Sequence, residues 1–250
     1  MNSELVKRLI VDSENFKQIR DNFLESRSLS DEDKMTLMSD RPKHSHISWG
    51  EKSFTLISWE GIEHLVECIK NTKDIDGDFI ETGVWMGGMC ILAKSVYDEL
   101  GLNKKVFVAD SFEGLPKPDP KYPHDNGDTH YLSEYLKVSI NKVKDNFSIF
   151  NCLDENVIFL KGWFKDTLNT DKIEKLSILR LDGDMYESTW DSLNSLYHKL
   201  SSGGYCIIDD YLHKGCKEAV NDFRNKHNIT EPIIKVSGNP DDEVHYWIKK

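Results

Sequence analysis

Residues 78–88 read Asp-Phe-Ile-Glu-Thr-Gly-Val-Trp-Met-Gly-Gly, a short apolar run followed by a glycine-rich turn. This pattern is typical of a strand that leads into a helix in an α/β sheet, where ligands collect at the carboxyl ends of the strands. Glycines there let the backbone approach a ligand, and the next helix offers N–H groups to an anionic group. The turn therefore predicts a nucleotide-type ligand site, although a plain strand–helix connection has the same appearance.

Short apolar runs alternate with helical stretches on both sides of this turn, which predicts an α/β fold with a mainly parallel sheet. The tail adds two strand candidates around a turn at residues 238–242, and we expect that last pair to be antiparallel. The predicted strands are 78–82, 105–109, 156–160, 176–181, 205–208, 233–236 and 244–249, and the predicted helices lie near 87–100, 132–149, 188–200 and 215–227.

Two regions stand apart from this alternation. Residues 1 to about 60 have a polar, helix-like periodicity, so we expect a helical extension and lid at 1–58 and a ligand-binding domain at 59–250. The segment 116–129 contains four prolines and a glycine, which predicts neither helix nor strand. Long loops inside a domain are usually functional or mobile, and this loop is interpreted as a second lid over the site.

The composition narrows the class of protein. A net charge of −11 over 250 residues argues against nucleic-acid or anionic-membrane partners. The sequence contains neither a long apolar span nor a signal-peptide pattern at its start, and its five cysteines lack metal-site spacing. We therefore expect a cytoplasmic protein without disulfides. Homo-oligomerisation through the N-terminal helices is also expected.

Two residues refine the ligand prediction. A dinucleotide-binding turn has a glycine two residues after its first glycine, where this chain has Trp85, a side chain that would block a pyrophosphate. Asp110 ends the next strand and is placed to accept both hydroxyls of a ribose. The alternative for Asp110 is a turn cap before Ser111. Together the two residues favour an adenosyl ligand without separating S-adenosylmethionine from NAD.

Three aspartates follow two further strands. Asp182 ends the strand 176–181, and Asp209 and Asp210 end the strand 205–208. If these strands are neighbours, the carboxylates converge, and their repulsion favours a hard cation such as Mg²⁺ among them. The alternative is that such acids cap helices, which is the preferred reading for Asp184.

Histidines and aromatic residues supply weaker candidates. His124 and His130 flank the proline-rich loop, where either a surface position or a base in the site fits the sequence. His213 is interpreted as a helix-start residue. Trp163 either lines an adenine slot or packs in the core.

Five long motifs in this order resemble the macrocin O-methyltransferase family, whose members methylate sugar hydroxyls in macrolide and aminocoumarin biosynthesis. The resemblance covers about residue 54 to the C-terminus, and the N-terminal fifty residues resemble nothing specific. The motifs are FIETGVWMGG at 79–88, VADSFEGLP at 108–116, GWFKDTL at 162–168, LRLDGDMYEST at 179–189 and IIDDY at 207–211.

The resemblance implies a class I S-adenosylmethionine methyltransferase fold, Rossmann-like, with seven strands of which the last is antiparallel. It implies Mg²⁺ ligands at Asp182, Asp209 and Asp210, a ribose contact at Asp110 and a methionine-end loop around Glu81. By motif position, the full set of implied cofactor contacts is Thr55, Glu81, Thr82, Gly83, Gly87, Gly88, Asp110, Ser111, Gly162, Trp163 and Asp182.

We therefore predict an S-adenosylmethionine- and Mg²⁺-dependent O-methyltransferase that acts on a hydroxyl of a sugar or another polyhydroxylated small molecule, in natural-product or cell-surface glycan biosynthesis. Mg²⁺ would acidify the acceptor hydroxyl, and Asp182, favoured over His124 or His130, would take its proton. The rival hypotheses are an NAD-dependent oxidoreductase, a non-catalytic binding protein and a metal hydrolase.

Overall fold

The computed structural model describes residues 2–11, 53–238 and 243–250, and a seven-stranded sheet forms its centre. The strand order is β3-β2-β1-β4-β5-β7-β6, with the pairs from β3 to β5 parallel and β7 antiparallel to both of its neighbours. This confirms the predicted Rossmann-like class I fold. The strands are β1 (Asp78–Thr82), β2 (Val106–Asp110), β3 (Val157–Lys161), β4 (Leu176–Leu181), β5 (Leu200–Ile208), β6 (Ile234–Lys235) and β7 (His245–Ile248).

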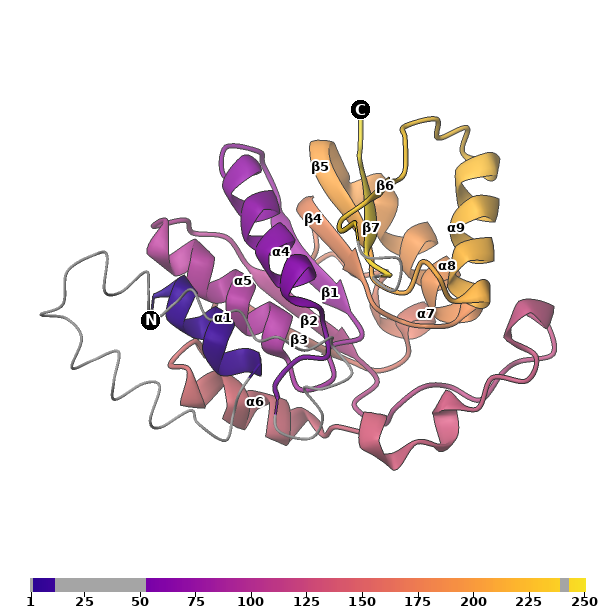
Figure 1. Ribbon diagram of the computed structural model, residues 1–250, viewed down its shortest axis with the longest axis horizontal. Helices are drawn as coiled ribbons and strands as arrows, with labels where there is room; N and C mark the ends of the chain where they lie inside the picture. The colour runs from indigo at the N-terminus through magenta and orange to yellow at the C-terminus, as the bar shows by residue number, and fades with distance from the viewer. Residues whose placement is uncertain (1, 12–52, 239–242) are drawn as a thin grey trace, which may run out of the picture.

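Helices cover both faces of the sheet, as Figure 1 shows. One face carries α1, α4, α5 and α6, and the other carries α7, α8 and α9. The helices are α1 (Ser3–Val11), α4 (Trp59–Asn71), α5 (Gly88–Glu99), α6 (Ile140–Ile149), α7 (Phe164–Thr167), α8 (Tyr186–Leu196) and α9 (Lys214–Lys226), with 3₁₀ turns η4 (Pro123–Asp125), η5 (His130–Leu132), η6 (Glu134–Leu136) and η7 (Tyr197–Lys199).

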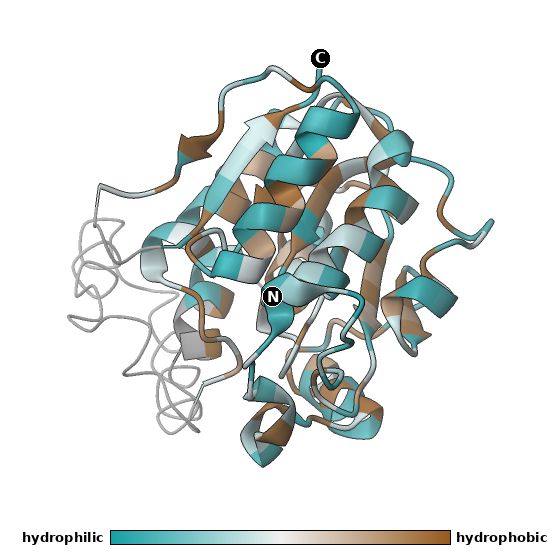
Figure 2. Cartoon of the chain, turned by 90° about the vertical axis from the view of Figure 1, so that its right-hand side faces the viewer, coloured by the Kyte–Doolittle hydropathy of each residue, from teal (hydrophilic) through white to brown (hydrophobic). Residues whose placement is uncertain are grey.

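The strands are apolar on both faces because each face packs against helices. In β1, Phe79 belongs to the core under α4 and α5, while the next residue, Ile80, belongs to the core under α8 and α9. The helices are apolar on one side only, and Figure 2 shows their outer surfaces as largely hydrophilic. Among the described helices, none combines the length and the apolar character that crossing a membrane requires.

The predicted N-terminal helical extension is partly described. Residues 3–11 form α1, which packs on α5 through buried residues such as Val6 and Ile10. Residues 12–52 lie outside the described part, so the boundary at 58 stays a prediction. Residues 53–58 are not helical, which corrects the expectation for that stretch, and the helix α4 begins at Trp59 with Ser58 as its N-cap.

Two expectations for the segment between β2 and the end of α6 were wrong. The predicted helix 132–149 is two 3₁₀ turns followed by α6, because Ser139 caps a new helix by accepting a hydrogen bond from the backbone N–H of Lys142. The loop 116–129, expected to lack helix, contains the 3₁₀ turn η4. Its first residue is Pro123, whose missing N–H costs nothing there. Elsewhere, β5 begins at Leu200, five residues before the predicted start.

Candidate active site

A cavity of about 380 Å³ opens at the carboxyl ends of β1, β2, β4 and β5. This volume suits a small-molecule ligand. The parallel pairing of β4 with β5 satisfies the condition under which the aspartates were expected to converge. The predicted site residues that line the cavity are Thr55, Glu81, Gly83, Asp110, Ser111, His130, Gly162, Trp163, Asp182, Asp209 and Asp210.

The turn after β1 requires glycine for steric reasons. Gly83 has φ +86°, and a Cβ atom there would lie 1.6 Å from the carbonyl oxygen of Asp182, which follows the neighbouring strand β4. A Cβ at Gly88 would lie 2.4 Å from the carbonyl oxygen of Phe54, which accepts a hydrogen bond from the Gly88 N–H at 2.9 Å. The segment around Phe54 therefore crosses the start of α5, and Thr55 beside it lines the cavity.

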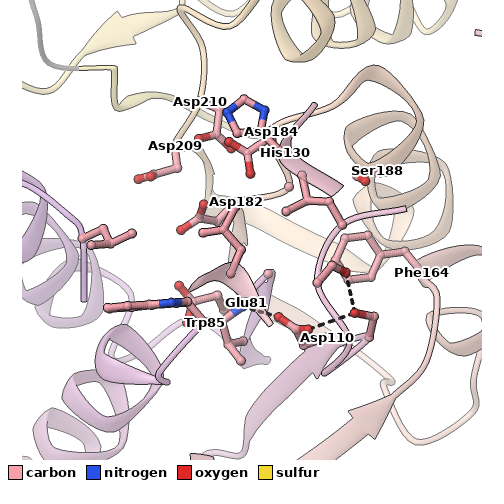
Figure 3. A pocket seen from close by; sticks show the side chains of 18 of the residues that line it. Glu81, Trp85, Asp110, His130, Phe164, Asp182, Asp184, Ser188, Asp209 and Asp210 are labelled. Carbon is pink, nitrogen blue, oxygen red and sulfur yellow. Dashed lines mark hydrogen bonds between the residues drawn. The ribbon is translucent and has the colours of Figure 1, made fainter. Parts of the chain in front are cut away.

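Asp110 both caps a turn and lines the cavity. Its carboxylate accepts hydrogen bonds from the backbone N–H of Val84 at 2.9 Å and of Phe112 at 2.6 Å. The bond to Val84 ties the end of β2 to the glycine turn after β1. Figure 3 shows Asp110 and Trp85 at one end of the cavity and the aspartates of β4 and β5 at the other.

Trp85 lies in the turn with φ +44° and also lines the cavity. Its indole N–H donates a hydrogen bond to the carbonyl oxygen of Tyr135 at 3.0 Å, and the two rings are 5.2 Å apart. The side chain thus links the turn to the loop between β2 and α6.

Arg180, the next-to-last residue of β4, was not among the predicted site residues. Only 1% of its side chain is exposed, and its guanidinium contacts the carboxylates of Glu81, Asp182 at 2.8 Å and Asp209 at 2.5 Å. One buried cation therefore holds acidic residues from β1, β4 and β5 together. The sequence signal was available, because an arginine inside an apolar strand needs buried anionic partners.

The carboxylates still outnumber this cation. Burial raises the pKa of Asp209 and of Asp210 well above the usual range, and repulsion from neighbouring carboxylates adds to the shift, although Arg180 opposes it at Asp209. Burial also raises the pKa of Glu81 to about 7, against the effect of Arg180. Cys90 donates a hydrogen bond to Glu81 at 2.8 Å. A further cation among these carboxylates would offset their mutual repulsion.

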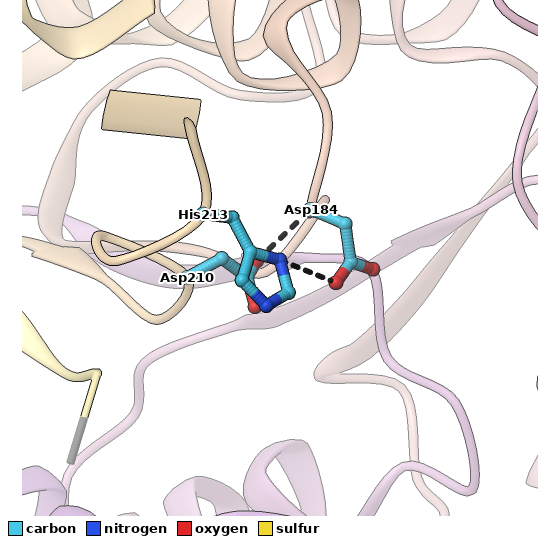
Figure 4. Close-up of side chains that lie close together, drawn as sticks. All are labelled: Asp184, Asp210 and His213. Atoms are coloured by element: carbon cyan, nitrogen blue, oxygen red, sulfur yellow. Dashed lines mark hydrogen bonds and ion pairs between the residues drawn. The ribbon is translucent and has the colours of Figure 1, made fainter. Parts of the chain in front are cut away.

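Two overlapping sets of residues in the described chain fit a metal ion. The predicted set is Asp182, Asp209 and Asp210, with one oxygen of each within 4.8 Å of the others. The second set, Asp184, Asp210 and His213, was not predicted (Figure 4). His213 does precede α9 as expected, and it also lines the cavity. Its hydrogen bond to Asp184 raises the pKa of His213 to about 8.

The two loop histidines lie in different places. His130 lines the cavity, and its ring stacks on that of His213 with centroids 6.0 Å apart. His124 instead stacks on Tyr186 at 5.2 Å and is not one of the described residues that line the cavity. Three further predicted contacts are also not among the described residues that line the cavity: Thr82 ends β1, Gly87 is the N-cap of α5 and Gly88 is its first residue.

The family model described as Macrocin-O-methyltransferase (TylF) matches residues 3–249. The chain belongs to the macrocin O-methyltransferase family. This confirms the resemblance inferred from the sequence motifs and identifies the protein as an S-adenosylmethionine-dependent O-methyltransferase.

Curated relatives and solved structures agree with this assignment. The demethyldecarbamoylnovobiocin O-methyltransferase of Streptomyces niveus is 41% identical over 205 residues, which are 80% of this chain and 77% of the relative. The mycinamicin III 3''-O-methyltransferase of Micromonospora griseorubida is 40% identical over 77% of each chain. The structure of the O-methyltransferase NovP has a TM-score of 0.78 at 39% identity, covering 82% of this chain and 86% of its own.

Proposed function

We propose that this macrocin-family enzyme methylates a sugar hydroxyl of a natural product or cell-surface glycan, with S-adenosylmethionine and a divalent cation in one cavity. The observation that carries the proposal is the shared cavity itself, in which the glycine turn and Asp110 face the aspartates that end β4 and β5. The sugar acceptor is supported by the name of a third relative, the 8-demethyl-8-(2,3-dimethoxy-alpha-L-rhamnosyl)-tetracenomycin-C 4'-O-methyltransferase of Streptomyces olivaceus, which includes a rhamnosyl group.

The methyl donor fits the end of the cavity formed by the ends of β1 and β2. Asp110 is placed there to accept ribose hydroxyls, and Gly83 permits close approach of a ligand to the turn. Trp163, 37% exposed, offers a ring face to the adenine. Ser111 and Gly162 complete this end, and the segment with Thr55 covers it.

Replacing Gly83 with alanine tests the donor site. The added methyl group meets the carbonyl of Asp182, so the turn must move, and we expect S-adenosylhomocysteine to lose its stabilising effect in a thermal-shift assay. For wild type that effect amounts to about 2.7 kcal/mol at a ligand concentration one hundred times Kd. Gly101→Ala is the matched control, because Gly101 also has positive φ but nothing lies within 4 Å of its Cβ position. A normal ligand response from Gly83→Ala would refute this placement.

Asp182, Asp209 and Asp210 are the proposed metal ligands. Three carboxylate oxygens that lie close together suit a hard cation such as Mg²⁺, and each aspartate touched by Arg180 keeps a second oxygen for the metal. A bound cation would also relieve the repulsion that raises the pKa of Asp209 and Asp210. The set with His213 offers a nitrogen ligand, which Mg²⁺ favours less.

The chemical problem is that a sugar hydroxyl is a weak nucleophile at neutral pH. When bound, the cation supplies Lewis-acid acidification of that hydroxyl. Asp182 is the proposed proton acceptor, since it lines the cavity and is 25% exposed. Arg180 fixes the orientation of this carboxylate through its contact at 2.8 Å. His130 lies at the same end and is assigned to acceptor contact.

Removal of the metal is expected to abolish turnover. Enzyme dialysed against EDTA should release no S-adenosylhomocysteine with an accepted glycoside, and added MgCl₂ should restore the rate. The binding of S-adenosylhomocysteine, measured by calorimetry, should be unaffected by EDTA, because the proposed donor contacts at the glycine turn and Asp110 do not involve the metal. Full turnover in EDTA would contradict the metal proposal while leaving the methyltransferase assignment intact.

The acceptor class is tested with the three compounds that appear in the names of the relatives. Mycinamicin III, demethyldecarbamoylnovobiocin and 8-demethyl-8-(2,3-dimethoxy-α-L-rhamnosyl)-tetracenomycin C form the panel. We expect mass spectrometry to detect a gain of one methyl group on at least one of them. Methylation of catechols in preference to every glycoside would overturn the sugar assignment.

A further inference from the structure

Asp125 is a buried carboxylate in the loop between β2 and α6, and only 3% of it is exposed. It accepts hydrogen bonds from the backbone N–H groups of Tyr186 at 2.6 Å and Glu187 at 3.0 Å. These are the first two residues of α8, which begins just after the Asp182–Asp184 segment. Asp125 thus connects its loop to the start of α8, the helix that follows Asp182 and Asp184 in the chain.

The attachment replaces a missing helix cap. The N-cap residue of α8 is Met185, whose side chain accepts no hydrogen bond from the helix. A carboxylate at this end satisfies two orphan N–H groups and interacts favourably with the helix dipole. Gly215 in α9 leaves room for it, since a Cβ there would lie 2.6 Å from Asp125 Oδ1.

A short chain of contacts leads from this anchor into the cavity. The backbone carbonyl of Asp125 accepts a hydrogen bond from the N–H of Asp128 at 3.0 Å. The carboxylate of Asp128 accepts one from the backbone N–H of His130 at 2.8 Å and lies 3.0 Å from its Nδ1. The imidazole of His130 lines the cavity beside His213. Each link is within hydrogen-bonding distance, so the position of His130 depends on where Asp125 is held.

We propose that Asp125 is a positioning residue that holds His130 against the acceptor, so that it controls methyl transfer to the sugar without affecting the binding of the methyl donor. The proposal rests on the proposed function, because it assigns His130 to the acceptor end of the cavity. Asp125 itself does not line the cavity, so its effect on the reaction is indirect.

The anchor is tested first without turnover, by hydrogen exchange on the enzyme with S-adenosylhomocysteine and MgCl₂. Asp125→Ala should speed amide exchange at residues 128–132 by about tenfold or more, because two hydrogen bonds to a charged group are lost. Asp119→Ala is the matched control, since the carboxylate of that exposed loop aspartate accepts a hydrogen bond from the backbone N–H of Lys121 in the same loop. Unchanged exchange in Asp125→Ala would overturn the proposal whatever reaction the enzyme catalyses.

A double-mutant cycle then separates positioning from simple stabilisation, using the panel glycoside that is methylated fastest. Asp125→Ala should lower kcat/KM for the glycoside by about ten- to a hundredfold and leave the Kd of S-adenosylhomocysteine unchanged. In a His130→Ala background the same change should cost less than about twofold, because both substitutions remove one function. Equal losses in both backgrounds, or full activity of His130→Ala, would show that Asp125 does not act through His130.

Discussion

Replacing Asp182 with asparagine is expected to lower kcat by about a hundredfold to ten-thousandfold, the usual contribution of a positioned proton acceptor. Asparagine has nearly the same shape, and its carbonyl oxygen still accepts the hydrogen bond from Arg180, so the fold should survive. The substitution removes the negative carboxylate that would take the proton of the sugar hydroxyl and help to bind the cation. Turnover is measured by S-adenosylhomocysteine release at saturating MgCl₂.

A comparison with Asp184→Asn identifies the metal site. Asp182 belongs to the set completed by Asp209, whereas Asp184 belongs to the set completed by His213. We expect Asp182→Asn to weaken the activation by MgCl₂ more than Asp184→Asn does, while the exposed Asp171→Asn should behave as wild type. The opposite ranking would move the cation to the His213 set. An Asp182→Asn enzyme with normal kcat would refute both roles assigned to this carboxylate.

The seven strands and four of the helices between them were predictable because apolar runs and glycine turns are local features of the sequence, whereas α4 and the short α7 were not predicted. The start of α6 was not, because the helical pattern from 132 onward continues through Ser139, where a single side-chain hydrogen bond begins a new helix. Helix propensity averaged over a window of residues does not detect a single side chain that bonds to the backbone in this way. The antiparallel end of the sheet was correctly predicted from two short runs around one turn.

The candidate site was predictable where its residues lie at the ends of strands, and unpredictable where contacts across the fold bring its residues together. Asp110 is the last residue of β2 and Asp182 follows β4 directly, so their positions at the rim follow from the topology. Asp125 lies in a loop, 61 residues before the helix that it caps, and only the packing of that loop brings the two together. His213 was recognised as the start of a helix, but its contact with Asp184 joins two loops.

Arg180→Met is expected to cost about 3–5 kcal/mol of stability, the usual effect of removing one partner from a buried ion pair. The substitution leaves Glu81, Asp182 and Asp209 without the cation that all three contact. For a domain of this size the loss corresponds to a fall in Tm of roughly 6–20 °C. Arg180→Lys should recover only part of it, because one ammonium cannot reproduce the planar fork of a guanidinium.

The control for Arg180→Met is Lys175→Met, which removes a cation just before the other end of β4. Lys175 contacts Asp76 at 2.6 Å, but both side chains are largely exposed, so solvent already screens the pair and we expect little change in Tm. Because Arg180 joins the glycine-turn strand to the proposed metal ligands, Arg180→Met should also weaken both S-adenosylhomocysteine binding and MgCl₂ activation. Differential scanning calorimetry and calorimetric titration measure the two effects separately. If Arg180→Met had the same Tm as Lys175→Met, the Arg180 guanidinium would not be what holds the three carboxylates together.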